Sequence, residues 1–308
     1  MLNSMKKQNF FSPLLVFASA LLFAACQPEP LEELSSSAKL QNGADTSQHE
    51  ALAEIKKAED WFPLQYKWPN PLPASALVKK MVWSESDFVE FTYNKAGQVA
   101  RRYSQWQFVQ GDPTKIKKFI SDFQYDPQHK LAEMTSPDGP TTQYFYQGDW
   151  IEKVRKVIPA TGLVLEEVNY SKANHRIVQE VRRFTSPTTG ETTMIKSVFG
   201  YDAKGNLNKV ETYAKSGGAG SGNPFVLQEI VLYSDFDDKV NPTGWMLRTP
   251  YLPQVRWQLN NPRKKTVILA IAQTKKVTTY TYTYNEQGLP ASQTTFSEGG
   301  ALTVSFQY

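Results

Sequence analysis

The chain has 308 residues, with 34 lysines and arginines against 30 aspartates and glutamates, a net charge of +4 at neutral pH. It contains one cysteine and three histidines. These counts exclude a disulfide framework and any zinc site of Cys and His spacing, and no basic helix or nucleic-acid motif accompanies the modest charge. We therefore expect no cofactor and no nucleic-acid partner.

Residues 1–25 have the features of a secretion signal. Lys6 and Lys7 precede an apolar run, too short to span a bilayer comfortably, that ends in Leu-Leu-Phe-Ala-Ala-Cys at Cys26. The last five residues, from Leu22 to Cys26, resemble the lipobox of bacterial lipoproteins. The resemblance implies removal of the signal and acylation of Cys26, which would anchor the protein stably in a membrane. The alternative is an ordinary signal region with a free cysteine.

After the cysteine, residues 26–47 are interpreted as a disordered acidic tether and residues 48–60 as a short helix. The tether is rich in Ser, Gln, Pro and Asn and has little to bury. The helix would begin with a capping box at residues 47–50 and has apolar residues at helical spacing. Residues 27–60 carry eight acidic residues against three lysines, a balance of −5. Without the two signal lysines, this leaves +7 on residues 61–308. Such a charge is compatible with polyanions such as acidic glycans or lipopolysaccharide, and equally with a surface charge that serves no binding role.

Two features beside Cys26 bear on where the anchored protein lies. Gln27 takes the position at which an aspartate, in many Gram-negative lipoproteins, signals retention in the inner membrane. Glu29, Glu32 and Glu33 resemble the acidic export signal of surface lipoproteins in some Gram-negative lineages. These resemblances imply a lipid-anchored protein of the outer membrane at the cell surface, with a periplasm-facing orientation as the alternative.

A short motif recurs in the body of the chain: aromatic, any residue, Tyr, Asn or Asp, two polar residues, Gly, polar, aliphatic. Its clear copies are residues 91–99, 199–207 and 282–289, and looser copies are residues 123–131, 144–151 and 168–177. Alternating aromatics place large side chains on one face of a strand, Asn or Asp bonds the backbone of a turn, and Gly supplies the left-handed residue of a bulged hairpin. The motif therefore predicts six hairpins. The expected turn positions are Asn94, Gly97, Asp126, Asp202, Gly205, Asn285 and Gly288, and His129 and Asn174 stand at or beside the place of a missing glycine.

Further turn signals alternate with period-two segments throughout residues 61–308, and no Pro-rich or charge-rich break divides them. We predict a single all-β domain, an antiparallel meander of repeated hairpins that forms a closed or strongly curled soluble β-barrel. Residues 176–184 place charges on both faces of a strand, with Glu180 on one and Arg183 on the other, which argues against lipid contact on either side.

The hairpin motif resembles the Tyr-Asp (YD) repeats of RHS-type shell proteins. A second resemblance rests on the hairpins together with residues 237–242, the pair Asn260-Asn261 and the last Tyr-x-Tyr-Asn-x-x-Gly hairpin. These features are similar to a Gram-negative lipoprotein family, a domain of unknown function with a porin-like barrel fold. The resemblance implies a fold and assigns no activity.

Catalytic chemistry finds little support. With Cys26 committed to lipid there is no free thiol, Gly-x-Ser-x-Gly is absent, and the histidines lie at the tether and in turns. Scattered carboxylates such as Glu152, Glu166 and Glu167 leave a polysaccharide hydrolase or lyase as the alternative function, because the spacing of such a pair is spatial. Adjacent glutamates on a strand face opposite sides, which argues against a matched pair.

Clustered acidic residues form a weak calcium candidate. Asp235, Asp237 and Asp238 lie close to the amide of Asn241, and calcium prefers oxygen ligands. The same residues are equally typical of Asx turns that end a strand before Pro242. No EF-hand spacing follows, so we expect no metal.

The stretch from 235 to 257 breaks the hairpin rhythm and is our candidate functional region. Its prolines disfavour regular strand pairing, and loops carry most binding sites. The candidate ligand-binding residues are Trp245, Arg248, Tyr251, Arg256 and Trp257. The competing interpretation is a lid that seals the barrel end. We expect a non-enzymatic binding or structural protein, whose ligand is a glycan or an envelope protein.

Overall fold

The computed structural model describes residues 74–109, 112–137, 139–215 and 222–308. The predicted signal, the lipidation site, the tether and the short helix lie outside these residues, so those predictions stay predictions. None of the helices in the described ranges is long and apolar enough to cross a membrane.

The described residues form sixteen antiparallel strands and three single-turn 3₁₀ helices, so the all-β prediction is confirmed. In order along the chain they are η1 Ala74–Ala76, β1 Lys80–Val82, β2 Phe88–Tyr93, β3 Val99–Gln107, η2 Pro113–Lys115, β4 Ile116–Tyr125, β5 Leu131–Thr135, β6 Thr141–Gln147, β7 Trp150–Val157, β8 Val164–Ala173, β9 Arg176–Thr185, β10 Thr192–Tyr201, β11 Leu207–Lys215, β12 Val226–Ser234, η3 Gly244–Leu247, β13 Lys264–Leu269, β14 Thr274–Tyr284, β15 Pro290–Ser297 and β16 Gly300–Gln307.

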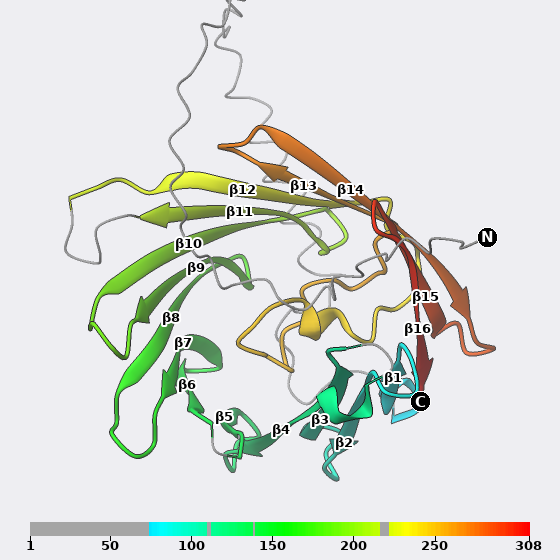
Figure 1. The fold of residues 1–308 in the computed structure, drawn as a ribbon, viewed down its shortest axis with the longest axis horizontal. Coiled ribbons are helices and arrows are strands. Elements are labelled where there is room, and N and C mark those ends of the chain that lie inside the picture. Colours follow the sequence, from blue (N-terminus) through cyan, green and yellow to red (C-terminus); the bar gives the residue numbers. More distant parts are fainter. Residues whose placement is uncertain (1–73, 110–111, 138, 216–221) are drawn as a thin grey trace, which may run out of the picture. The chain divides into compact units, whose positions relative to one another are not determined.

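Each strand pairs with its neighbours in the sequence, and β1 also pairs with β16, which closes the meander into a barrel (Figure 1). The sequence left open whether the sheet is a closed barrel or only strongly curled, and the structure shows a closed barrel. Closure removes the free edge strands that would otherwise be available for aggregation.

All six predicted hairpins are present, and each has a residue with positive φ in its turn. Gly97, Gly205 and Gly288 have φ of 74°, 91° and 73°, and His129 and Asn174 adopt φ of 65° and 49° in place of glycine. The side chains at the turn entrance accept backbone N–H groups as expected, for example Asn206 N–H to Asp202 Oδ1 at 2.8 Å. The strand register shifts next to these turns, which is the predicted bulge. Because strands alternate in direction, all six turns lie at one end of the barrel, called the hairpin end below.

Four tyrosines of the motif tie their hairpins to the segment that precedes them. Their hydroxyls donate to backbone carbonyls, in the pairs Tyr93 to Val78, Tyr125 to Val99, Tyr146 to Leu131 and Tyr201 to Ile177, at 2.7–2.9 Å. In the last hairpin, Tyr284 donates instead to the carboxylate of Asp237. Burial raises the pKa of Tyr93 and Tyr125 well above the ordinary value, so the phenols stay protonated donors. In these four hairpins the bond explains why the position carries Tyr rather than Phe.

Side chains alternate between the inside and the outside of the barrel. The inward positions supply the buried core, which includes Val89, Phe91, Phe123 and Val168. On the outside, Arg101 and Asp122 face each other across β3 and β4 in an ion pair of 2.5 Å. The wall therefore has an apolar inner face and a polar outer face.

Burial of the inner face falls off away from the hairpin end. Along β4, the exposed fraction of the inward residues is 46% at Phe119 and 5% at Phe123, and along β16 it is 42% at Leu302 and 4% at Val304. The packed positions are those nearest the hairpins, so the barrel is filled at the hairpin end and accessible from the opposite end.

Candidate functional site

Residues 235–263, called the inner segment, replace the turn expected between β12 and β13. These two strands pair directly, so the segment leaves and re-enters the sheet at the hairpin end. Figure 1 shows it in gold inside the ring of strands. It contains η3 and an isolated bridge between Val240 and Asn260 but no regular strand, which agrees with the proline pattern.

The inner segment is the most deeply buried irregular part of the described chain. Leu252 and Val255 have no exposed surface, and Trp257 is 1% exposed. Its indoles reach different walls: Trp257 packs on Phe199 of β10 at 5.1 Å between ring centroids, and Trp245 packs edge-on against Phe91 of β2 at 5.7 Å. The segment therefore bridges the barrel interior and forms much of its core.

A buried asparagine ties the inner segment to a hairpin. The Oδ1 of Asn206, which has no exposed surface, accepts the backbone N–H groups of Leu259 at 2.9 Å and Asn260 at 2.8 Å. The backbone N–H of Leu207 donates to the carbonyl of Trp257 at 2.7 Å. The polar position after the motif glycine thus satisfies backbone groups that an irregular buried segment would otherwise leave unpaired.

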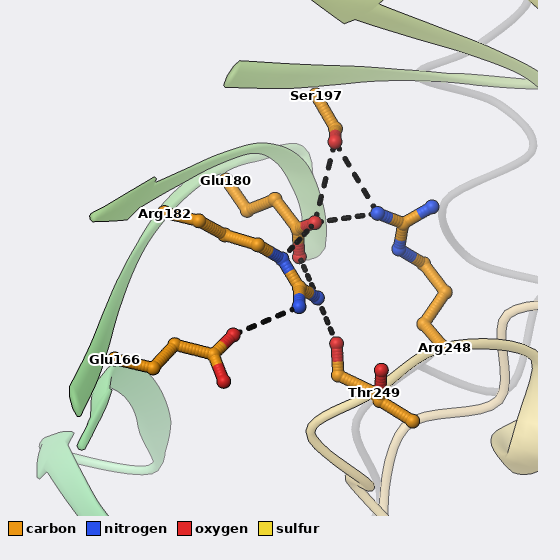
Figure 2. A network of polar contacts seen from close by, with 6 residues as sticks. All are labelled: Glu166, Glu180, Arg182, Ser197, Arg248 and Thr249. Carbon is orange, nitrogen blue, oxygen red and sulfur yellow. Dashed lines mark hydrogen bonds and ion pairs between the residues drawn. The ribbon is translucent and has the colours of Figure 1, made fainter. Parts of the chain in front are cut away.

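Deeper in the barrel, a charged cluster joins the inner segment to the wall (Figure 2). Glu180 of β9 is 1% exposed and accepts from Arg182 Nε at 2.9 Å and from Arg248 at 2.5 Å. Arg182 also binds Glu166 of β8 at 3.0 Å and donates to the backbone carbonyl of Thr249. We call these residues, together with Ser197, the Glu180 network.

The electrostatics of the Glu180 network favour the charged form of both Glu180 and Arg182. Burial alone would raise the pKa of Glu180, but the adjacent Arg248 and Arg182 outweigh it and hold this pKa below its ordinary value. Burial would likewise lower the pKa of Arg182, yet Glu180 raises it. Two arginines and two glutamates thus compensate one another, which is the condition for keeping charges inside a core.

The structure gathers the five candidate ligand-binding residues in the inner segment, but not as one open surface. Trp245 and Trp257 are buried in the core, and Arg248 is held by Glu180. Arg256 is largely enclosed, and burial lowers the pKa of its guanidinium. Tyr251 lines a cavity. A ligand role for these residues therefore stays a prediction, while their packing role is observed.

The weak calcium candidates have other partners. Asp237 accepts from the side chain of Asn261 at 3.2 Å and from the hydroxyl of Tyr284, and its Oδ1 accepts the backbone N–H of Lys239. Asp238 is exposed beside Lys239. Within the described ranges no group of three His, Cys, Asp or Glu residues is arranged to hold a metal ion.

The carboxylates considered for hydrolysis do not face one another. Glu166 points inward to Arg182, whereas Glu167 points outward and binds Arg155 at 2.8 Å. The prediction that adjacent glutamates face opposite sides is confirmed. Glu152 is exposed.

Two cavities flank the inner segment. One of about 210 Å³ lies against β14, β15 and β16 and is lined by phenol and amide groups, among them Tyr233, Tyr280, Gln258 and Gln293. The other, of about 310 Å³, lies between the inner segment and the walls of β5 to β8. Its lining includes the side chains of Lys156 and Glu166.

Sequence reasoning missed Glu180, Arg182 and Asn206 as members of the site. The charges of β9 were visible in the sequence and were used only to argue against lipid contact. Their partners in the inner segment lie between 53 and 68 residues away, for example Arg248 for Glu180, and no local pattern marks them.

Comparison with solved structures shows a likeness in fold. A porin-like protein from Bacteroides vulgatus matches with a TM-score of 0.52 at 10% identity, over 75% of this chain and 98% of the other. A porin-like protein from Bacteroides uniformis matches with a TM-score of 0.49 at 14% identity, over 78% and 99%. The chain also aligns with 14% of a chain in the TcdB2–TccC3–Cdc42 structure, with a TM-score of 0.20. No family model and no curated protein matches the sequence.

Proposed function

We propose that this protein is a lipid-anchored binding or structural protein of the bacterial envelope, whose barrel is a scaffold rather than a pore. The observation that carries the proposal is the inner segment, which fills the hairpin end with the chain's own side chains. A barrel filled in this way offers an interior for a ligand and no path through it.

The outer wall supports a position outside the hydrocarbon core of the membrane. It carries ion pairs between Lys80 and Glu90, Arg155 and Glu167, and Lys209 and Glu211, in addition to Arg101 and Asp122. A membrane-spanning barrel needs an apolar band on its lipid face, where a charged side chain at mid-depth costs about 2–4 kcal/mol. The lipid at Cys26 is therefore the proposed membrane attachment.

Fold likeness at this level of identity assigns no activity, and the porin-like description belongs to the Bacteroides proteins. A non-enzymatic role is supported by the carboxylates, since Glu166 and Glu167 are on opposite faces and both are engaged by arginines. A glycan or an envelope protein remains the proposed ligand class.

Metabolic labelling tests the anchor. Cells that express the full chain should incorporate a fatty-acid analogue into it, and Cys26→Ser should abolish labelling and release the protein from membranes or leave the signal uncleaved. Labelling of Cys26→Ser equal to that of the wild type would rule out this anchor. Protease treatment of intact cells then separates the surface orientation, in which the protein is degraded, from the periplasm-facing one.

A conductance measurement tests the scaffold. The purified protein, added to planar lipid bilayers, should open no channels, whereas a porin in the same bilayer does. Reproducible channel openings that persist after removal of contaminating porins would contradict a filled barrel.

A further inference from the structure

The cavity of about 310 Å³ has the composition of a ligand site. It lies on the side of the inner segment that faces β5 to β8, and its walls include Thr142 of β6, Lys156 of β7, Glu166 of β8 and Tyr251 of the inner segment. Ligand pockets usually measure about 300–1,000 Å³, and the best ones combine apolar walls with a few convergent polar groups. Its apolar walls include Met134, Val154 and Val168. The volume is at the lower end of the range, which suits one ring-sized molecule.

Lys156 has no ion-pair partner among the described residues of the chain. It lies directly opposite Glu166 in the register of β7 and β8, where a salt bridge would be the ordinary outcome. Glu166 instead turns its Oε1 to Arg182 at 3.0 Å. Lys156 lines the cavity and forms no ion pair among the residues that the structure describes, so the Glu180 network beside it leaves its charge uncompensated.

A second cation lies behind the aromatic wall. The guanidinium of Arg102 stacks on the ring of Tyr251 at 5.2 Å from the centroid. Arg102 Nε is buried and has no hydrogen-bond partner within the described part of the chain. Arg102 and Lys156 thus give the cavity a positive potential, while the glutamate that lines it is already neutralised by Arg182.

Hydroxyl-recognising groups complete the lining. Thr142 is 2% exposed, and its hydroxyl is in no side-chain hydrogen bond among the described residues. Glu166 keeps its Oε2 available as an acceptor, because Arg182 takes Oε1. A donor, an acceptor, a cation and an aromatic wall are the groups that recognise a sugar ring bearing a carboxylate.

We propose that this cavity binds a single acidic sugar residue, a ring of hydroxyls that carries one carboxylate. Lys156 meets the carboxylate, Thr142 and Glu166 hydrogen-bond ring hydroxyls, and Tyr251 packs against the ring. The proposal deepens the binding role given above and rests on it, but it does not depend on the lipid anchor.

Calorimetric titration of the full chain in a neutral detergent tests the site, with D-galacturonate as the probe and D-galactose as its uncharged match. Galacturonate should bind at least about tenfold more tightly, because only its carboxylate can form a charge-assisted hydrogen bond with Lys156. Lys156→Gln should remove this preference. Lys153→Gln is the matched control, because Lys153 lies on the same strand, faces outward over Phe145 and should leave binding unchanged.

Thr142→Val, nearly isosteric, gives a second test if Lys156→Gln does not fold: it should weaken the binding of both sugars severalfold. The proposal is overturned if galacturonate does not bind, if galactose binds equally well, or if Lys153→Gln acts as strongly as Lys156→Gln. Equal binding of inorganic phosphate would reduce the cavity to an anion site and overturn the assignment of a sugar. Any of these results, combined with fatty-acid labelling at Cys26, would leave the proposed anchor intact.

Discussion

The six hairpin turns and the inner segment occupy the same end of the barrel, but their conformations are specified in opposite ways. Each turn is specified by the residues within it: Asn94, for example, accepts the N–H groups of Ala96 and Gln98 within a four-residue span. The inner segment is specified by partners far away in the sequence, such as Asn206 for Leu259 and Glu180 for Arg248. Interactions within a few residues therefore specify the hairpins of the barrel wall. Contacts between residues far apart in the sequence specify the segment that fills the barrel.

The first prediction removes the charge that holds the inner segment. Glu180→Gln should destabilise the protein by about 3–5 kcal/mol, because it leaves two arginines in the core without their shared anion. Chemical denaturation measures this. Gln179→Ala, on the outward face next to it, should change stability by no more than about 0.5 kcal/mol. Similar losses at both positions would show that the buried charge has no special role.

The second prediction compares two glycines with the same turn geometry. Gly288→Val should cost about 1 kcal/mol or more, since valine is poorly tolerated at φ of 73°. Gly205→Val should cost about 1–3 kcal/mol beyond that, because a Cβ there lies 2.8 Å from Arg176 and 3.2 Å from Leu259 of the inner segment.

Asparagine refines the comparison of glycines. Gly288→Asn should cost less than Gly288→Val, because Asn tolerates the left-handed region. At position 205 the difference in stability between Gly205→Asn and Gly205→Val should be smaller, because the crowding by Leu259 remains in both variants. If the two sites respond alike to both substitutions, the inner segment does not press against the turn of residues 202–205.

The third prediction concerns the wall alone. Tyr125→Phe removes the hydroxyl that donates to the carbonyl of Val99 at 2.9 Å, and should cost about 1 kcal/mol. Phe145→Tyr, which adds a hydroxyl on the outer face, is the control and should be close to neutral. No loss in Tyr125→Phe would remove the tyrosine bond as the reason for Tyr at this motif position.

The sequence carried enough information for the wall and too little for the interior. Alternation and turn chemistry predicted the all-β meander, the six hairpins and the left-handed role of His129, because each depends on neighbours within a few residues. The number of strands and the closure of β1 on β16 depend on pairing across the whole chain, and no local pattern encodes them.

The same limit explains the candidate site. The prolines and aromatics around Trp245 marked the inner segment as exceptional, so the region was found. The partners of this region could not be identified from the sequence, since Asn206 resembles any other polar residue that follows a turn glycine. Only the fold shows that its amide lies 2.8 Å from the backbone of Asn260. An irregular segment inside a core needs such partners for its backbone, and they come from wherever the fold supplies them.

Hydrogen exchange of the inner segment tests the central claim most directly. If the segment is a fixed part of the core, the amides of Asn241, Val255 and Leu259, all hydrogen-bonded inside the barrel, should exchange as slowly as those of β9 and β10. Exchange of these amides at the rate of the exposed turn at residues 186–190, with β9 and β10 still protected, would contradict it: the barrel would then be a wall around a mobile loop.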